Sequence, residues 1–469
     1  MSGQSRLLLV FAAAWIAGCT MIPEYTRPEP PVPPQWLAGP AYREPAAASE
    51  AQLAADLAWR DYFVDPRLQA LIETGLKDNR DLRAAALNVD RARALYRIQE
   101  SEILPIVDAS GRMVRERVPG TINGDGRSLT LKQYRVQAGV TAWEIDFFGR
   151  IRSLSQAALE QFFATEQARR SAQILLVSEI ANAYLALAAD RDSLALSRST
   201  LETQLAAYNL IRRRFEVGIV PELDLRQSQT RVDSARVDLV RFTEQVARDE
   251  NALNLLVGAS FDRGLLPEGL AAVTPPPVLA PGVPSDVLLR RPDVLQAESL
   301  LKSANANIGA ARAAFFPSIT LTGAVGTASG DLSNLFGPGS FAWNFTPQIT
   351  MPIFDPRVWG ALKVSEVDQE LAITNYEGTI QSAFRDVADA LARYGTIGEQ
   401  MAAQESLVNA TRETYRLSNA RYEKGVDIYL NVLDAQRSLY AAQQVLILTR
   451  LTQLSNQVQL YAALGGGAE

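Results

Sequence analysis

No histidine occurs in this chain, and only one cysteine does. Without histidine, the chain lacks the imidazole used in acid–base catalysis, in Ser-His-Asp triads, in Cys-His pairs and in the usual zinc sites. It also lacks an EF-hand loop, a glycine-rich phosphate loop and a GxSxG nucleophile motif. We therefore expect that the protein is not an enzyme and that it binds neither a metal nor a cofactor.

Basic surface is also scarce. The formal net charge is −6, and Lys and Arg are interspersed with Asp and Glu instead of forming runs, so we expect no nucleic-acid partner. Of the 469 residues, 47% are hydrophobic, and linkers are few. This composition favours one elongated body over several ordinary domains.

The amino terminus has the layout of an export signal. Arg6 precedes an apolar stretch, residues 7–17, that is too short for a stop-transfer helix. The stretch ends in Ile16-Ala17-Gly18-Cys19, which resembles the bacterial lipobox. That resemblance implies cleavage after residue 18 and acyl chains, palmitate among them, on Cys19; the alternative is a signal peptide with an incidental cysteine. Prolines then predict an extended tether over residues 19–48, with an inert disordered leader as the alternative.

The rest of the chain is a duplication. Residues 215–258 recur at 422–465 without a gap, so both copies are expected to build the same helical element. Matching residues 207 positions apart include Phe215 and Tyr422, Glu216 and Glu423, Gly218 and Gly425, Leu223 and Leu430, and Gln229 and Gln436. The domains that we predict are a signal peptide (1–18), a lipidated tether (19–48), a first repeat of helix, two strands, long helix and helix (49–258), a proline-rich linker (259–284), a second repeat (285–465) and a short tail (466–469).

Each repeat contains an unusually long helical segment. Residues 150–214 include no proline or glycine and are rich in helix formers, which predicts a continuous helix of about 90 Å. Beyond Gly218 and Pro221, apolar or small residues recur in steps of three and four, and the second copy keeps this register. The spacing predicts antiparallel coiled-coil hairpins, with an ordinary helical bundle as the alternative. Asp249 lies in the apolar register, where a lone carboxylate is costly and no partner is evident.

Between the helices, residues alternate with the period of two that is typical of strands. Tyr134, Val136 and Ala138 alternate with polar or small residues, as do Phe341, Trp343 and Phe345 near the second long helix. Such strands occur in outer-membrane barrels and at the edges of soluble sandwiches. The acylated start and the expected lack of an apolar helix of spanning length favour the barrel. Four strands per chain cannot close one, so a barrel must be shared between chains.

Several motifs together resemble a TolC-type outer-membrane factor, in the lipoprotein branch that serves multidrug (RND-type) efflux. They are the lipobox, Pro23-Glu24-Tyr25, Arg27-Pro28, Asp146-Phe147-Phe148-Gly149-Arg150, Leu288-Leu289-Arg290-Arg291-Pro292-Asp293 and the segment from Tyr422 to Arg437. The resemblance implies a mainly α fold with a β-barrel portion, assembled as a homotrimeric α/β-barrel channel with four transmembrane β-strands per chain. It also implies an outer-membrane location in a Gram-negative bacterium, a periplasmic adaptor (membrane fusion) protein and an inner-membrane pump.

The same resemblance assigns roles near the second helical turn. It implies narrow rings at Leu430 and Asp434, and ties between neighbouring helices at Tyr422, Asp427 and Asn431. A salt-bridged latch at Asp427 stays in question, because some relatives carry a basic residue there. The resemblance also implies adaptor contacts at the two turns, and Glu222 and Asp224 could add to an acidic mouth. The turn residues are Val217, Gly218, Ile219, Lys424, Gly425 and Val426.

We therefore predict a passive outer-membrane exit channel that takes drugs or other small molecules from an inner-membrane pump through a trans-periplasmic helical tunnel. Two alternatives stay open from the sequence. One is a lipid-anchored periplasmic scaffold without a pore. The other is an exit duct for a protein-secreting transporter.

Overall fold

The structure is a computed structural model, and it describes residues 20–42, 56–122, 124, 126–277, 279 and 285–467. The predicted signal peptide and Cys19 lie outside these residues. The described chain forms two compact units, each built from equivalent stretches of the two repeats. The first unit takes Val89–Thr165 and Ala297–Tyr376 together with the start of the chain, and the second takes Glu29–Asn88, Glu166–Gln296 and Glu377–Glu469.

Helices account for most of the described residues, and four of them are long. The α-helices are α2 (Trp59–Tyr62), α3 (Pro66–Asp78), α4 (Arg80–Ser101), α5 (Arg150–Glu216), α6 (Glu222–Val257), α7 (Pro292–Ala313), α8 (Pro356–Glu423) and α9 (Tyr429–Ala463). Short 3-10 turns lie at Arg263–Leu265, Leu270–Ala272, Ser285–Arg290 and Leu332–Asn334. α5 and α8 have 67 and 68 residues. This confirms the long helix predicted from the lack of proline and glycine over residues 150–214 and the long helix that the duplication predicts in the second repeat.

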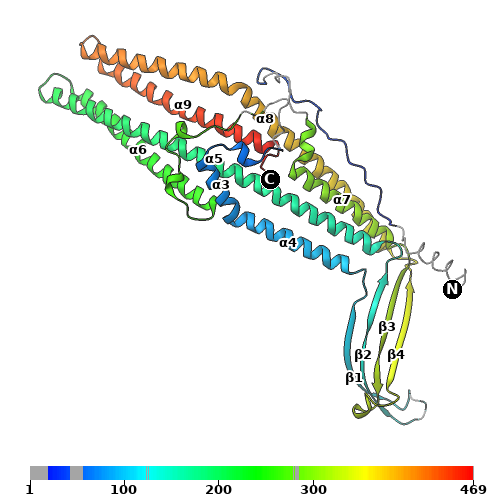
Figure 1. Cartoon of the computed structure of the whole chain (residues 1–469). Helices are drawn as coiled ribbons and strands as arrows, with labels where there is room; N and C mark the ends of the chain where they lie inside the picture. Colours follow the sequence, from blue (N-terminus) through cyan, green and yellow to red (C-terminus); the bar gives the residue numbers. More distant parts are fainter. Residues whose placement is uncertain are drawn as a thin grey trace. The chain divides into compact units, whose positions relative to one another are not determined.

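The first unit contains one antiparallel sheet of four strands in the order β1-β2-β3-β4 (Figure 1). The strands are β1 (Val107–Val118), β2 (Leu129–Ile145), β3 (Ser318–Ser329) and β4 (Phe341–Thr350). A bulge in β2 between Val140 and Trp143 shifts its register against β3. At Gly326 an added Cβ would meet the Val136 carbonyl oxygen at 2.1 Å, so glycine permits this close strand pairing.

The two faces of the sheet differ as the alternation predicts. Directly opposed residues share a face, and the register pairs Val325 with Trp343 and Gly323 with Phe345. Trp343 and Phe345 are 71% and 63% exposed in the chain, and we call this side the apolar face. The opposite side, which we call the polar face, carries Asn344 and Gln137 among small residues.

Residues 20–28 are extended and lie along α7 in the first unit. The Asn305 side-chain amide donates to the Pro23 carbonyl at 2.9 Å. Glu298, only 3% exposed, accepts from Arg27 at 3.0 and 2.5 Å and from the Tyr25 hydroxyl at 3.3 Å. The first part of the predicted tether is therefore bound to the body of the protein.

Residues 29–42 belong to the second unit and are bound there as well. The Ser285 hydroxyl donates to the Pro33 carbonyl at 2.8 Å. Trp36 stacks on Phe384 of α8 with ring centroids 5.0 Å apart. This proline-rich segment is extended, in line with its composition. A ring stack and a hydrogen bond to a backbone carbonyl hold it against the surface of the unit.

One expectation from the sequence is wrong. Among the described residues, one helix, α5, contains a window that is long and apolar enough to cross a membrane by composition. More than half of that window, 56%, is buried inside the chain. Ile180, Tyr184 and Leu187 are fully buried in the second unit, so these apolar residues form its core.

The coiled-coil register is confirmed on both hairpins. Val232 and Ala235 of α6 are buried, and so are Val432 and Ala435 of α9. The small alanine side chains allow the paired helices to approach closely, as Figure 1 shows for α8 and α9. The stripes therefore form the contact between helices of the second unit.

Asp249 of α6 has a partner that the sequence did not reveal. The Asp190 carboxyl of α5 bonds to it, and the Gln245 amide donates to its Oδ1 at 2.9 Å. Its Oδ2 is buried. Burial, followed by the hydrogen bond and the charge of Asp249, raises the pKa of Asp190 to about 7. The two carboxyl groups therefore share a proton at neutral pH.

This pair predicts a pH-dependent stability. Because the pKa of Asp190 is raised by folding, the shared proton stabilises the folded chain fully below about pH 4, the unfolded value, and that stability is lost as pH rises through about 7. Asp249→Asn should reduce the fall in melting temperature between pH 5 and pH 8 without abolishing it, because the burial of Asp190 remains. Asp233→Asn, which removes a surface partner of Arg236 at 3.2 Å, should leave the slope unchanged. An unaltered slope in Asp249→Asn would contradict the shared proton.

Candidate functional site

The two long hairpins of the second unit end in turns of the same design. After α5, the Ile219 amide donates to the Arg214 carbonyl at 2.8 Å, and Gly218 has φ 79°. After α8, the Val426 amide donates to the Arg421 carbonyl at 3.0 Å, and Gly425 has φ 71°. This is the Schellman arrangement, which needs a left-handed residue that glycine supplies without a Cβ penalty.

Both turns present apolar side chains outward. Val217 and Ile219 are 69% and 70% exposed at the first turn, and Val426 and Ile428 are 63% and 62% exposed at the second. Lys424 is also exposed. Exposed apolar residues gathered at one place are typical of an interaction surface.

Behind the turns, a small apolar cluster joins the two hairpins. Its buried members are Ile211, Tyr429, Val432 and Leu433, with Val220, Leu225, Tyr415 and Tyr422 packed against them. The rings of Tyr422 and Tyr429 are 5.1 Å apart, and the Arg214 guanidinium lies 5.6 Å over Tyr422. Burial raises the pKa of Tyr429 to about 12. Tyr422 is therefore placed in this cluster, and the hydrogen bonds of Asp427 within the described residues do not include it.

Leu430 and Asp434 lie on a different face of α9 from this cluster. They are one helical turn apart, Leu430 is 51% exposed, and the Asp434 side chain is 62% exposed. Asp434 also lines a groove of about 250 Å³ between α8 and α9. The other residues of this groove are mostly hydroxyl-bearing or small: Thr411, Thr414, Ser418, Asn431, Ala435 and Ser438.

Asp427 organises the start of α9. Its Oδ1 accepts from the Ile428 amide at 2.9 Å and from the Asn431 side chain at 2.5 Å, and its Oδ2 lies 3.2 Å from Arg421. The backbone hydrogen bond of Ile428, followed by the bond from Arg421, lowers the pKa of Asp427. The structure thus joins Asp427 and Asn431 and gives Asp427 an ion pair within its own hairpin.

Arginines supply the partners that the sequence did not assign. Arg437 pairs with Asp434 at 2.5 Å, three residues away on the helix, and this pair could have been found from helical spacing. Arg421 reaches Asp427 only because the glycine turn folds the chain back. Of the two acids near the first turn, Glu222 pairs with Arg226 at 3.1 Å, and Asp224 lies in the first turn of α6.

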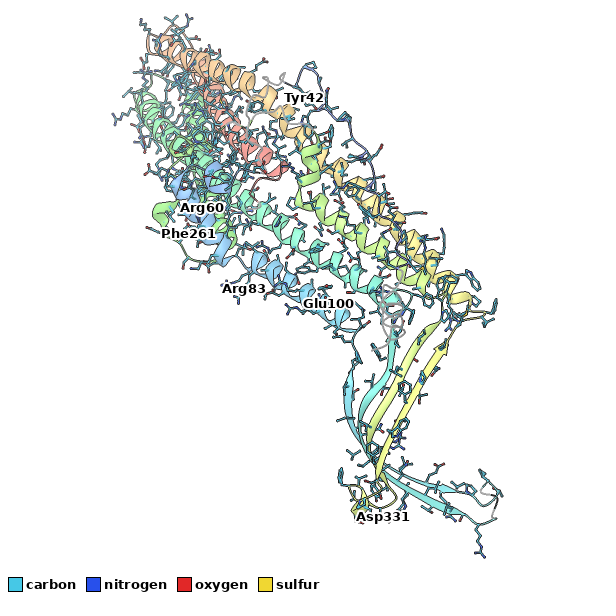
Figure 2. All side chains as sticks on the ribbon, turned by 45° about the vertical axis from the view of Figure 1, so that its right-hand side comes forward. Tyr42, Arg60, Arg83, Glu100, Phe261 and Asp331 are labelled. Carbon is cyan, nitrogen blue, oxygen red and sulfur yellow. The ribbon has the colours of Figure 1, made fainter. Side chains whose placement is uncertain are left out.

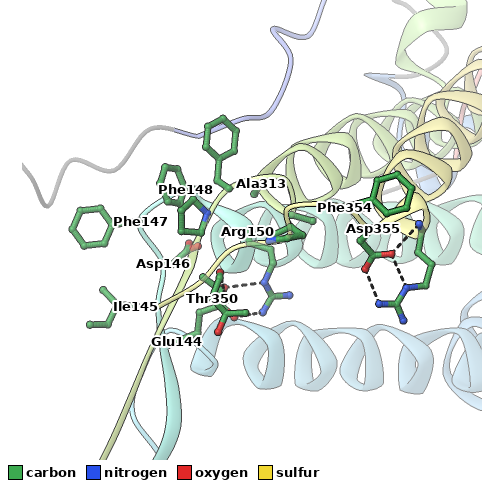
Figure 3. A pocket seen from close by; sticks show the side chains of 16 residues that line it. Glu144, Ile145, Asp146, Phe147, Phe148, Arg150, Ala313, Thr350, Phe354 and Asp355 are labelled. Carbon is green, nitrogen blue, oxygen red and sulfur yellow. Dashed lines mark hydrogen bonds and ion pairs between the residues drawn. The ribbon is translucent and has the colours of Figure 1, made fainter. Parts of the chain in front are cut away.

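A second site lies where the strands meet the helices of the first unit (Figure 3). Glu144 accepts from Arg150 at 2.9 and 2.7 Å, and Asp355 accepts from Arg357 at 2.8 and 2.6 Å. A cavity of about 640 Å³ opens between them, and Phe148 stacks on Phe316 at 4.8 Å. Arg150 and Arg357 are already paired with carboxylates of the chain. We therefore infer that these residues stabilise the turn from strand to helix and do not bind a ligand.

Comparison with known proteins identifies the family. The sequence profile described as "Outer membrane efflux protein" matches residues 71–259 and 283–466. The chain belongs to the outer membrane efflux protein family. The "Probable efflux pump outer membrane protein TtgC" of Pseudomonas putida is 48% identical over 466 residues, which cover 99% of this chain and 96% of that protein. OprJ of Pseudomonas aeruginosa is 40% identical over 469 residues, with 99% and 96% coverage.

Solved structures agree with this assignment. The open state of the MtrE outer membrane channel of Neisseria gonorrhoeae matches with a TM-score of 0.83 at 37% identity, over 96% of this chain and 99% of that one. A membrane protein from Pseudomonas aeruginosa matches with a TM-score of 0.87 at 38% identity, over 96% and 98%.

The comparisons confirm the predicted fold class, function and location. The chain is a subunit of a trimeric α/β-barrel channel in the outer membrane, and it forms the passive exit duct of an efflux system. Members of the family are channel proteins, and the family implies assembly with an adaptor and an inner-membrane pump. The family assignment favours the channel over a scaffold without a pore.

Replacing a turn glycine and a helix glycine by alanine should change the rate of hydrogen exchange in opposite directions. Gly425→Ala places a Cβ on a left-handed residue, at a cost of about 1 kcal/mol, so the amides of residues 420–432 should exchange hydrogen about fivefold faster. Gly378 lies inside α8 with no atom near its missing Cβ. Gly378→Ala should therefore slow exchange around it about twofold. Equal effects of the two substitutions would contradict the assigned role of Gly425.

Proposed function

We propose that Leu430 and Asp434, each contributed by three copies of the chain, form the two narrow rings of a gate at the end of the channel where the two turns lie. The observation that carries this proposal is the orientation of α9. It buries Tyr429, Val432 and Leu433 against its own chain and leaves Leu430 and Asp434 exposed on another face. Exposed side chains one turn apart can meet their symmetry mates.

The two rings would act by different physical means. A ring of leucines excludes water and solutes by dewetting when it is narrow, and a ring of carboxylates attracts cations. Arg437 partly offsets the charge of Asp434 at 2.5 Å. Because that pair is exposed, it contributes little to stability and does not prevent the gate from opening.

We further propose that the periplasmic adaptor docks on the two turns. Val217, Ile219, Val426 and Ile428 supply exposed apolar surface there, and burying it would stabilise the docked state. Gly218 and Gly425 shape the turns, and Lys424 adds a charge at the rim of the second one.

The cargo that we propose is small organic molecules delivered by an inner-membrane pump. Relatives from Pseudomonas putida that are 48% and 43% identical to this chain are named as a toluene efflux pump protein and a solvent efflux pump protein. Another at 48% identity is named as an antibiotic efflux pump protein. A passive duct needs no catalytic group, and we propose that the chain has none.

We also propose that Cys19 carries acyl chains. Support comes from the lipobox-like residues before it and from the docking of the residues that follow it on α7. Several acyl chains anchor a protein stably, because each buried CH₂ contributes about 0.8 kcal/mol.

Gate function is tested by conductance of the purified trimer in a planar bilayer. Leu430→Ala with Asp434→Ser should raise the single-channel conductance several-fold, because the apolar and acidic constrictions are both removed. Leu448→Ala, at a similarly exposed leucine of α9 away from the turn, should leave conductance at the wild-type level. Wild-type conductance in the double variant would remove both residues from the gate.

Acylation is tested by growth with a radiolabelled fatty acid. The wild type should incorporate the label and Cys19→Ser should not, because no other thiol exists in the chain. Label retained by Cys19→Ser would contradict the assignment of Cys19, whatever the outcome for the gate.

A further inference from the structure

The charged residues of the sheet are distributed unevenly. β3 and β4 contain none, and all of them lie on β1 and β2. Two pairs of cations stand directly opposite each other across these strands, Arg112 with Arg135 and Arg115 with Lys132. Like charges in this position destabilise a sheet. No ion pair within the described residues involves any of the four, so the described chain itself does not offset their repulsion.

The two pairs lie on different faces of the sheet. Arg115, Lys132 and also Arg117 lie on the apolar face, because they alternate with the polar-face residues and match Met113 and Tyr134 in parity. The apolar face of the four strands contains no Asp or Glu, whereas Glu116 lies on the polar face. The three cations therefore form a patch without an acidic neighbour on its own face. We call Arg115, Arg117 and Lys132 the cationic patch.

The cationic patch begins where the aromatic residues of the apolar face end; these residues are Tyr134, Phe341, Trp343 and Phe345. Phe341 pairs with Thr327, which pairs with Val136, and Ser329 at the end of β3 pairs with Tyr134. Arg115 and Lys132 lie two residues farther along the ribbon of β1 and β2, a rise of about 7 Å. Arg115 is the ninth residue of β1, and a strand crosses the apolar layer of a membrane in about 9–11 residues.

This end of the strands is the one remote from the helices. Figure 2 places Asp331, in the connection after β3, at the opposite end of the strands from Glu100 of α4. Since the helices of this channel family lie in the periplasm, the β1–β2 turn faces the outside of the cell. Asp331 forms no ion pair with the patch. The patch therefore lies on the lipid-facing side at the level of the outer-leaflet headgroups.

We propose that Arg115, Arg117 and Lys132 bind the phosphate groups of lipopolysaccharide in the outer leaflet. Guanidinium groups match phosphate oxygens in a bidentate manner, and an ammonium group adds a compact charge. The aliphatic stems of the side chains can lie against acyl chains while the heads reach the phosphates. The proposal rests on the outer-membrane channel and its orientation, and it is independent of the gate and of the adaptor.

Binding is measured by native mass spectrometry of the detergent-purified trimer with diphosphoryl lipid A. The variant Arg115→Gln, Arg117→Gln, Lys132→Gln should bind roughly a hundredfold more weakly, since three cations at an anionic surface are lost. The matched control is Arg112→Gln with Arg135→Gln, which removes an opposed pair from the same two strands on the polar face. The control should bind like the wild type.

Further arms identify the source of the phosphate. With wild-type protein, phosphate-free lipid A should bind much more weakly, inorganic phosphate should not displace diphosphoryl lipid A, and vesicles of phosphatidylglycerol should compete poorly. The charge-retaining variant Arg115→Lys, Arg117→Lys, Lys132→Arg should keep binding and shows whether the side chains' charge is sufficient.

Equal binding by the glutamine variant and the wild type would overturn the proposal, and so would an equal loss in the polar-face control. Wild-type binding of phosphate-free lipid A would also overturn it, and that result requires no variant to fold. Displacement by inorganic phosphate, or equal binding of phosphatidylglycerol, would reject lipopolysaccharide as the ligand. Conductance of the same preparations in a phospholipid bilayer should be unchanged, which separates this result from any failure of the proposed gate.

Discussion

The unpaired backbone edges of β1 and β4 are the constraint on which the rest of this molecule depends. Hydrocarbon offers no hydrogen-bond partner, and each unsatisfied peptide group there costs several kcal/mol. A sheet of four strands has two such edges, so it can enter a membrane only when edges of other copies complete it. Closure with other copies is therefore a requirement of the backbone, and the trimeric barrel of the family supplies it. Without closure, the apolar face of Trp343 and Phe345 could not be placed in lipid.

The duplication gives the chain two similar helical hairpins, which differ in the side chains near their turns. The two turns have the same Schellman hydrogen bonds around Gly218 and Gly425. These bonds join backbone atoms, so they form in both copies although the side chains differ. At matching positions both copies keep a leucine, Leu223 and Leu430, and both are more than half exposed. Asp434 has a neutral counterpart, Gln227, in the first copy. A charged ring in the trimer would therefore receive one residue per chain, from the second hairpin only.

Local pattern was sufficient to predict the elements of this fold. The lack of proline and glycine over residues 150–214 predicts α5, and alternation around Tyr134 and Trp343 predicts strands. Sequence spacing could not show contacts between residues far apart in the chain. Asp190 and Asp249 are 59 positions apart and meet only when two helices pack.

The same limit applies to binding and burial. The docking of Arg27 on Glu298 spans 271 positions, so a proline-rich start was predicted without its binding site. The apolar window of α5 was missed from the sequence, and its burial shows that composition alone does not separate a buried core from a membrane span. At the candidate gate, Leu430 and Asp434 came from family resemblance. The ion pair of Arg421 with Asp427 required knowledge of how the turn folds the chain back.

A comparison of ion pairs and apolar burial at the two turns indicates which interaction would drive opening of the proposed gate. The ion pair of Arg437 with Asp434 is largely exposed, and in the pair of Arg421 with Asp427 the arginine side chain is 59% exposed and the aspartate 23%. Solvent-accessible pairs of this kind contribute about 0–1 kcal/mol. Fully burying one exposed aliphatic side chain contributes about 1.5–3 kcal/mol. Val217, Ile219, Val426 and Ile428 together thus hold more free energy for a docked partner than the polar contacts hold against movement. In the gate that we propose, a partner that covers this apolar surface would therefore supply most of the free energy for opening, and the ion pairs would contribute little.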